Sequence, residues 1–283
     1  MDRILRIDMG ASGGPKVTLD TKGQYAGLGG RALTSMIIAA EVDPTANPLG
    51  AENKLVIAPG LLSGTAAAMS GRISVGCKSP LTGGIKEANS GGQVAQVLAR
   101  LGYTAIILEG LAPEGKLYKI YINKDGVKIE PADEYKMLPN YDLIEKIKEV
   151  YGDKVACMSI GPAGEMKLAA SSIACTDMEF RPTRHAGRGG VGAVMGSKGV
   201  KIIIMDDAGL KNREPKDPEK FREANKKWVE GLRSHAVTGQ ALPTYGTNVL
   251  VNIINESGGF PTRNFHEGRF EGASAISGET FAD

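Results

Sequence analysis

Cysteine and aromatic side chains are scarce in this chain of 283 residues, which contains three cysteines and 5% aromatic residues. Cys77, Cys157 and Cys175 lie far apart and include no Cys-x-x-Cys pair. This spacing indicates neither a disulfide framework nor a closed metal site. We therefore expect three buried free thiols.

Long apolar runs and a dominant charge are also missing. No stretch approaches the ~20 apolar residues that a membrane span requires, and the first residues lack the pattern of a secretion signal. The 34 basic and 32 acidic residues are interspersed and give a formal net charge of +2. Such a composition disfavours nucleic acid as a partner. We expect a cytoplasmic protein that binds neither nucleic acid nor membrane.

Glycine is abundant, with 38 residues, and it concentrates in the segment 183–198. Arg184, His185 and Arg188 stand beside these glycines. Free backbone N–H groups in such a turn, leading into a short helix, are typical of a phosphate site, and arginine adds charge-assisted hydrogen bonds. The alternative is that the glycines only allow a helix to pack closely on strands.

A similar pattern occurs about one hundred residues earlier, which indicates an internal repeat. Segments 90–108 and 189–205 both read as a Gly-Gly turn, a short helix, a glycine stop and a buried strand. The repeat predicts an α+β fold with two similar β-sheets and short helices, and one phosphate site in each half.

Local patterns predict further elements. Residues 3–8 read as an edge strand that opens a hairpin with 17–19, and Asp125-Gly126 predicts a second hairpin that ends the first half. We expect Asp142 to cap a helix and strand 155–159 to begin the second half.

The composition becomes helical after residue 208. Asp217-Pro218 predicts a helix start, followed by one apolar stripe and a second helix over 247–255. These helices have no obvious partner, so we expect a first domain over 1–208 and an incomplete helical domain over 209–283. The alternative is that both helices pack back on the sheets. The stripe consists of Phe221, Ala224, Trp228 and Leu232.

Two nucleotide-binding patterns can be compared with the glycine block. Gly187-x-Gly189-x-x-Gly192 matches a dinucleotide fingerprint, but charged residues and a proline precede it where a buried strand is needed. The block ends in Gly-Ser-Lys, which is the wrong order for a P-loop. His185 and Glu87 could transfer protons, yet no catalytic residue stands out.

Seven segments together resemble one known family. They are 43–49, 52–55, 79–83, 88–92, 159–165, 186–198 and 242–256. In this order, over nearly the whole chain, they resemble the aldehyde ferredoxin oxidoreductase family of tungsten enzymes. That family carries a tungsten ion bound by two molybdopterins whose phosphates are bridged by magnesium.

The resemblance implies an oxidoreductase that converts aldehydes to carboxylic acids and passes electrons through a 4Fe-4S cluster to ferredoxin. It places magnesium on the backbone carbonyls of Asn89 and His185. His185 departs from the family, in which a small residue is usual at this position. The cofactor contacts that it implies are Arg72, Asn89, Ser90, Gly91, Arg184, His185, Gly187 and Arg188.

Members of this family are much longer, and their cluster cysteines and catalytic residues lie further along the chain. The resemblance therefore implies the N-terminal part of such an enzyme, inactive alone, that forms a homo-oligomer or binds a complementary C-terminal chain. A dinucleotide-binding oxidoreductase and a non-catalytic pterin-binding subunit are the alternatives. The choice between tungsten and molybdenum, and the identity of the aldehyde, stay open.

Overall fold

The computed structural model describes residues 3–282 and divides the chain into two compact units, the first ending at Glu214 and the second beginning at Pro215. The boundary falls slightly after the predicted residue 208, because Arg213 is still bonded to the first unit. Its backbone N–H donates to the carbonyl oxygen of Gly64 (2.7 Å), and its guanidinium donates to that of Ser63 (2.7 Å).

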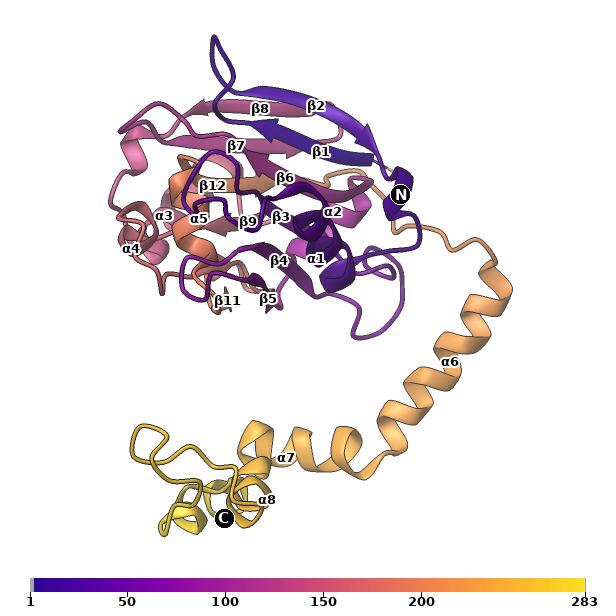
Figure 1. Ribbon diagram of the computed structural model, residues 1–283. Coiled ribbons are helices and arrows are strands. Elements are labelled where there is room, and N and C mark those ends of the chain that lie inside the picture. Colours follow the sequence, from indigo (N-terminus) through magenta and orange to yellow (C-terminus); the bar gives the residue numbers. More distant parts are fainter. Residues whose placement is uncertain (1–2, 283) are drawn as a thin grey trace. The chain divides into compact units, whose positions relative to one another are not determined.

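The first unit contains two six-stranded sheets (Figure 1). The first sheet has the strand order β2-β1-β6-β3-β4-β5, and its only parallel pair among the described strands is β1 with β6. Its strands are β1 (Arg3–Asp8), β2 (Lys16–Thr21), β3 (Leu55–Pro59), β4 (Ile73–Lys78), β5 (Ile85–Ser90) and β6 (Tyr103–Glu109).

The second sheet repeats this topology strand for strand. Read from its other edge, its order is β8-β7-β12-β9-β10-β11, and β7 and β12 are parallel. The predicted α+β fold with two similar sheets is therefore confirmed. The strands are β7 (Tyr118–Asn123), β8 (Gly126–Pro131), β9 (Ala156–Ser159), β10 (Ile173–Cys175), β11 (Arg184–Ala186) and β12 (Val200–Met205).

The repeat extends to an irregularity in the strands. The pairing of β1 with β6 skips Thr104, and the pairing of β7 with β12 skips Lys201 at the equivalent place. Both residues are buried. Lys201 forms an ion pair with Glu165 and donates to the carbonyl oxygen of Leu138 (2.9 Å), so its buried charge is compensated.

Two strand assignments differ from the sequence predictions. The hairpin β7-β8 belongs to the second sheet and does not end the first half, and β1 lies between β2 and β6 and is not an edge strand. Both errors have one cause. Parallel pairing joins strands that are far apart in sequence, and no local pattern reveals it.

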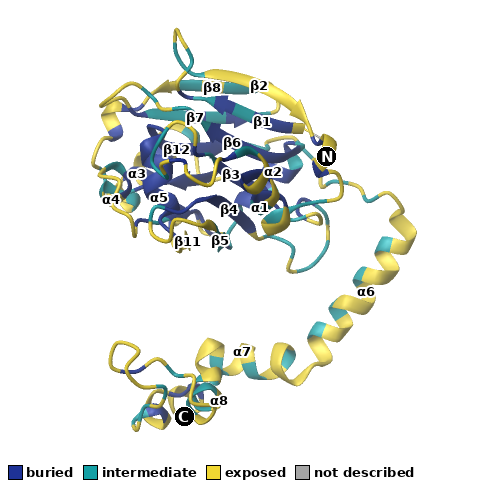
Figure 2. Cartoon of the chain, viewed as in Figure 1, coloured by how far each residue is buried: buried dark blue, intermediate teal, exposed yellow. Residues whose placement is uncertain are grey.

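Helices cover both sheets and fill the space between them. Helix α1 (Gly30–Glu41) packs on one face of the first sheet, and α3 (Asn140–Tyr151) packs on one face of the second. Helices α2 (Val94–Arg100) and α5 (Val191–Ser197) each contact strands of both sheets and join them in one core. The buried strands and α5 form the dark interior of Figure 2.

The shorter elements repeat as well. A 3-10 turn precedes α1 and α3 in each half, and both turns end in a buried tyrosine. Asp142 does not cap α3, because the helix begins earlier, at Asn140. Its carboxylate lies in the first turn, where its negative charge interacts favourably with the helix dipole. The remaining elements are η1 (Gly23–Tyr25), η2 (Asp133–Tyr135) and α4 (Pro162–Glu165).

The second unit begins with the predicted helix. In α6 (Pro218–Ser234), the side chain of Asp217 accepts the backbone N–H of Lys220 (3.0 Å), which confirms the predicted start. No residue of α6 is buried, and Trp228 of the apolar stripe is half exposed. The unit also contains η3 (Ala236–Ala241), α7 (Leu242–Tyr245), η4 (Gly246–Val249), α8 (Leu250–Glu256), η5 (Ala273–Ile276) and α9 (Gly278–Ala282).

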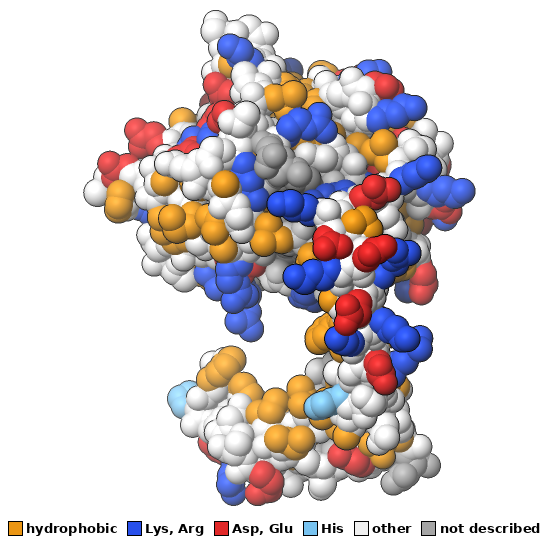
Figure 3. All heavy atoms as spheres, turned by 90° about the vertical axis from the view of Figure 1, so that its right-hand side faces the viewer, with side chains coloured by type: hydrophobic (Ala, Val, Ile, Leu, Met, Phe, Trp, Pro, Cys, Tyr) orange, Lys and Arg blue, Asp and Glu red, His pale blue; other side chains and the backbone are white. Residues whose placement is uncertain are grey.

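The surface shows no separation of charge on the face drawn in Figure 3, where basic and acidic side chains are interspersed. Among the described helices, none combines the length and the apolar character needed to cross a bilayer.

We expect Gly196→Ala to lower the free energy of unfolding of the first unit by about 1–3 kcal/mol, because overpacking a close contact forces the backbone to move. A Cβ atom on Gly196 in α5 would overlap the carbonyl oxygen of Gly164. The matched control is Gly231→Ala in α6, where the added methyl group meets no atom within 4 Å. Denaturant unfolding measures both; equal behaviour of the two variants would contradict the packing argument.

Candidate functional site

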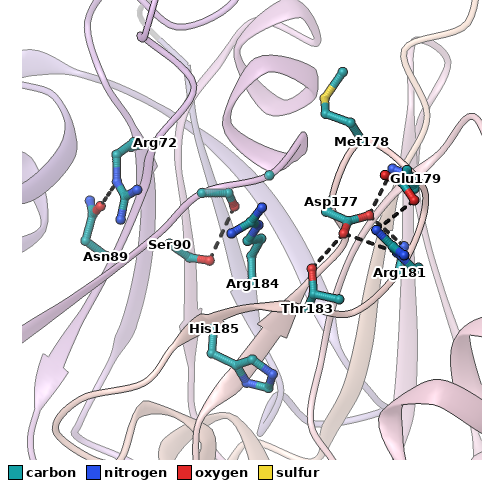
Figure 4. Close-up of a pocket in the computed structure, with 12 residues that line it drawn as sticks. Arg72, Asn89, Ser90, Asp177, Met178, Glu179, Arg181, Thr183, Arg184 and His185 are labelled. Carbon is teal, nitrogen blue, oxygen red and sulfur yellow. Dashed lines mark hydrogen bonds and ion pairs between the residues drawn. The ribbon is translucent and has the colours of Figure 1, made fainter. Parts of the chain in front are cut away.

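The candidate site consists of two pockets where the edge strands of the two sheets, β5 and β11, lie in contact. Their volumes are 480 Å³ and 660 Å³, and Asn89 and His185 line both. All eight predicted cofactor contacts line these pockets. Arg72, Asn89, Ser90, Gly91, Arg184 and His185 line the first pocket (Figure 4), and Asn89, His185, Gly187 and Arg188 line the second.

Arg72 enters the first pocket from the residue before β4. Its Nε donates to the side-chain oxygen of Asn89 on β5, as Figure 4 shows. The amide nitrogen of Asn89 donates in turn to Ser74 Oγ (3.3 Å). Because an amide oxygen carries no full charge, this contact orients the guanidinium without neutralising it, and its charge stays available for an anion.

The turn that leads to Arg184 is held by Asp177. The Asp177 carboxylate accepts the backbone N–H of Arg181 (3.0 Å), the Thr183 hydroxyl (2.7 Å) and the backbone N–H of Glu179 (2.9 Å). Burial alone would raise the pKa of Asp177, but these hydrogen bonds lower it to about 2. The carboxylate therefore fixes the turn, and the chain enters β11 with Arg184 in the pocket.

His185 stands on the wall that both pockets share. Its Nδ1 is hydrogen-bonded to Ser172 Oγ (2.9 Å), and the residue is exposed. This hydrogen bond orients the imidazole ring through Nδ1. The other ring nitrogen, Nε2, takes no part in it.

The Gly-Gly turns do not offer all the free N–H groups that their sequence predicts. The N–H of Gln93 donates to the carbonyl oxygen of Thr176 (3.1 Å), and the N–H of Gly192 donates to that of Ser171 (3.1 Å). A Cβ atom on Gly92 would overlap the Thr176 carbonyl oxygen. At these positions the glycines serve close packing, and the cationic groups that line the pockets are mainly arginine side chains.

Several residues of the pockets were missed by the sequence analysis. Arg31 forms an ion pair (3.4 Å) at the second pocket with Glu87, which the sequence had already suggested for proton transfer, and Lys86 lines the same pocket. Arg181 lines the first pocket but pairs with Glu179 (2.7 Å). No strand was predicted over 85–90, and only the pairing of β5 with β4 shows which side chains of this segment reach the site.

The lysine at the end of the glycine block lies away from the pockets. Lys198 is fully buried, and its ammonium group donates to the carbonyl oxygen of Gly50 (2.9 Å). Burial lowers the pKa of Lys198 to about 8. The residue joins the two halves and does not act as a P-loop lysine.

The cysteines are free and buried, as predicted. Burial raises the pKa of Cys77 and of Cys175 to about 12, so neither is prepared to act as a thiolate ligand. Within residues 3–282, no group of three or more His, Cys, Asp or Glu side chains could hold a metal ion.

The donor set of the site suits a ligand with two anionic groups. Arg72 and Arg184 line one pocket, and Arg188 and Lys86 line the other. A dinucleotide fits less well, because β11 before Gly187 has only three residues, two of them exposed, and pairs antiparallel with β10.

The sequence matches the N-terminal domain of aldehyde ferredoxin oxidoreductase over residues 4–207 and its domains 2 and 3 over residues 223–283. The chain belongs to the aldehyde ferredoxin oxidoreductase family. This is a family of oxidoreductases, and the match confirms the resemblance drawn from the glycine block and the six other segments.

Individual relatives give the same result. The chain is 43% identical to the tungsten-containing aldehyde ferredoxin oxidoreductase of Pyrococcus horikoshii over 281 residues, which are 99% of this chain and 45% of the relative. It is 45% identical to the enzyme of the same name from Pyrococcus furiosus, over 90% of this chain and 41% of that relative. The chain thus spans less than half the length of these relatives.

A solved structure shares the fold. The active-site complex BamBC of benzoyl coenzyme A reductase, determined with 1,5-dienoyl-CoA, superimposes with a TM-score of 0.74 at 30% identity. The match covers 82% of this chain and 34% of that chain.

We expect Asp177→Asn to destabilise the first unit by about 1–2 kcal/mol at neutral pH, through loss of charge-assisted hydrogen bonds. Since the folded-state pKa of Asp177 is depressed to about 2, its contribution is complete above the unfolded pKa of about 3.9 and is lost as the pH falls toward 2. Denaturant unfolding of both proteins from pH 6 to pH 2 measures this.

The control for this series is Asp125→Asn, in the exposed hairpin turn between β7 and β8, where Asn-Gly suits the turn as well as Asp-Gly. Its unfolding should follow the wild type at every pH. A difference between wild type and Asp177→Asn that does not change with pH would refute the role of the carboxylate.

Proposed function

We propose that this chain binds a tungsten bis-molybdopterin cofactor and forms part of an oxidoreductase that converts aldehydes to carboxylic acids. One observation carries the proposal. The two halves of the repeat together supply arginines to two adjoining pockets, Arg72 and Arg184 to the first and Arg31 and Arg188 to the second, and the pockets share the wall made by Asn89 and His185. A ligand with two phosphate-bearing arms, one in each pocket, matches this arrangement.

In this proposal the arginines bind the phosphates. Arg72 and Arg184 serve one pocket and Arg188 serves the other, since a guanidinium recognises phosphate by paired hydrogen bonds. Ser90, Gly91 and Gly187 complete the contacts. The backbone carbonyls of Asn89 and His185 would hold a magnesium ion, because hard cations prefer oxygen ligands, and the ion would offset phosphate charge.

When bound, the cofactor supplies a two-electron oxidation in which an aldehyde and water give a carboxylic acid, two protons and two electrons. The residues of this chain bind and orient the cofactor and neutralise its phosphates. We propose that the electrons leave through a 4Fe-4S cluster to ferredoxin. The buried cysteines do not suit such a cluster, so its ligands and the catalytic acid-base groups belong to residues outside this sequence.

The same observations support a second candidate, a non-catalytic subunit that holds the pterin cofactor for a partner chain. The chain matches less than half of its relatives' length, and its three thiols are buried. A complementary C-terminal chain would supply the missing groups, whereas a second copy of this chain would form a homo-oligomer, and we place either assembly in the cytoplasm. Transfer of bound cofactor from this chain to a partner would favour the second candidate.

We expect the chain to bind pyrophosphate, and Arg184→Ala to weaken that binding about tenfold or more, since each charged hydrogen bond contributes roughly 1.5–3 kcal/mol. Calorimetric titration measures it, with the exposed Arg233→Ala as the control. Titrations with NAD and FAD separate the alternatives. Tight NAD binding that is lost in Gly189→Ala would favour a dinucleotide enzyme instead.

We also expect no iron–sulfur cluster after anaerobic reconstitution of the chain alone, because a 4Fe-4S cluster needs four cysteine ligands and the sequence has three. Iron and acid-labile sulfide analysis tests this. About four iron atoms per chain, in a protein shown to be monomeric, would contradict the assignment of the cluster ligands to other residues.

A further inference from the structure

The segment that delivers Arg72 to the pocket is a long connection between β3 and β4, spanning residues 60–72. Its apolar side chains do not hold it in place. Leu61, Leu62 and Met69 are all more than half exposed, and Met69 has a left-handed backbone conformation (φ 61°). The order of this connection therefore depends on polar contacts.

One set of contacts comes from Gln96 in α2. Its side-chain oxygen accepts the backbone N–H of Gly64, and its amide nitrogen donates to Ser70 Oγ (3.3 Å). The same nitrogen packs against Gly71, where a Cβ atom would lie 3.2 Å away. A single side chain thus holds the first part of the connection at Gly64 and its last part at Ser70 and Gly71, directly before Arg72.

A second set comes from Arg213, next to the boundary of the first unit. Its guanidinium donates to the carbonyl oxygens of Ser63 (2.7 Å) and Leu61 (3.3 Å), and its backbone N–H donates to that of Gly64 (2.7 Å). Burial lowers the pKa of Arg213. In the described part of the chain no carboxylate forms an ion pair with it, so carbonyl oxygens provide its hydrogen bonds.

The first and last parts of the connection are also bonded to each other, because Ser63 Oγ donates to the carbonyl oxygen of Ser70 (2.6 Å). The connection is therefore closed at its base and held from two sides. At the other end of the residue, the Arg72 guanidinium donates a hydrogen bond to the side-chain oxygen of Asn89. The backbone end of Arg72 depends on Gln96, and its charged end depends on Asn89.

We infer that Gln96 and Arg213 are positioning residues for Arg72, which hold residues 60–71 so that the Arg72 guanidinium is fixed in the anion pocket before a ligand arrives. This inference rests on the proposed function of Arg72 as a phosphate contact. Order that exists before binding raises affinity, because the ligand does not have to restrict the arginine and its connection.

A double-mutant cycle with pyrophosphate as the probe tests the inference. Gln96→Leu should weaken binding about fivefold in the wild-type background and leave the affinity of Arg72→Ala unchanged, because residues that act through one another are not additive. Gln96→Glu keeps the acceptor for Gly64 but loses the donor to Ser70, so its loss should be intermediate. An equal loss in both backgrounds, or no loss in either, would overturn the inference.

Hydrogen exchange measured on the free chain provides a readout that needs no ligand. Exchange over residues 61–71 should rise in Gln96→Leu and in Arg213→Ala and stay at the wild-type level in the control Arg233→Ala. Unchanged exchange in both variants would overturn the inference even if binding were weakened. If the wild type does not bind pyrophosphate, or Arg72→Ala binds it equally well, the proposed function fails instead.

Discussion

The site depends on how closely the two halves of the repeat approach each other at their Gly-Gly turns. Gly92 lies so near the Thr176 carbonyl that a methyl group would not fit, and the next residue, Gln93, donates its N–H to that carbonyl. At the Gly-Gly turn of the second half, Ser79 Oγ from the first half donates to the carbonyl oxygen of Gly189 (2.7 Å). These contacts bring the edge strands β5 and β11 together, so the pockets exist only when both halves are folded and joined.

The hydrogen-bond and ion-pair partners of each arginine distinguish the arginines whose charge is available to the pocket from those that hold the fold. Arg72 is bonded to an uncharged amide, so its charge is still available to the pocket. Arg181 lines the same pocket but is paired with Glu179 and Asp177, and its charge is already balanced. Arg213 bonds to carbonyl oxygens at the base of a connection. Arg181 has its acidic partners next to it in the sequence, whereas the partners of Arg72 and Arg213 lie elsewhere in the chain, so sequence neighbours alone do not separate the roles of these two.

The sequence predicted the repeat and its short helices, because glycine turns and buried strands leave strong local patterns, and the family resemblance named eight of the residues that line the pockets. It also predicted the cap of α6 at Asp217. Properties set by distant pairing were not accessible. The interior position of β1 requires β6, and the assignment of the hairpin β7-β8 requires β12. The turn fixed by Asp177 and the burial of Lys198 likewise depend on contacts across the fold, so nothing in their local sequence distinguished them from surface residues.

The order of strands has a consequence for the path by which the chain folds. Strand β1 acquires its parallel partner only when β6 has been made, yet all strands of the first sheet lie within residues 3–109, so that sheet can assemble before the second begins. Its inner face is then bare, because the core between the sheets also needs Ile120, Met158 and Ile203. Until the ribosome has released β12, the nascent chain exposes an apolar sheet face of the kind that recruits chaperones or aggregates.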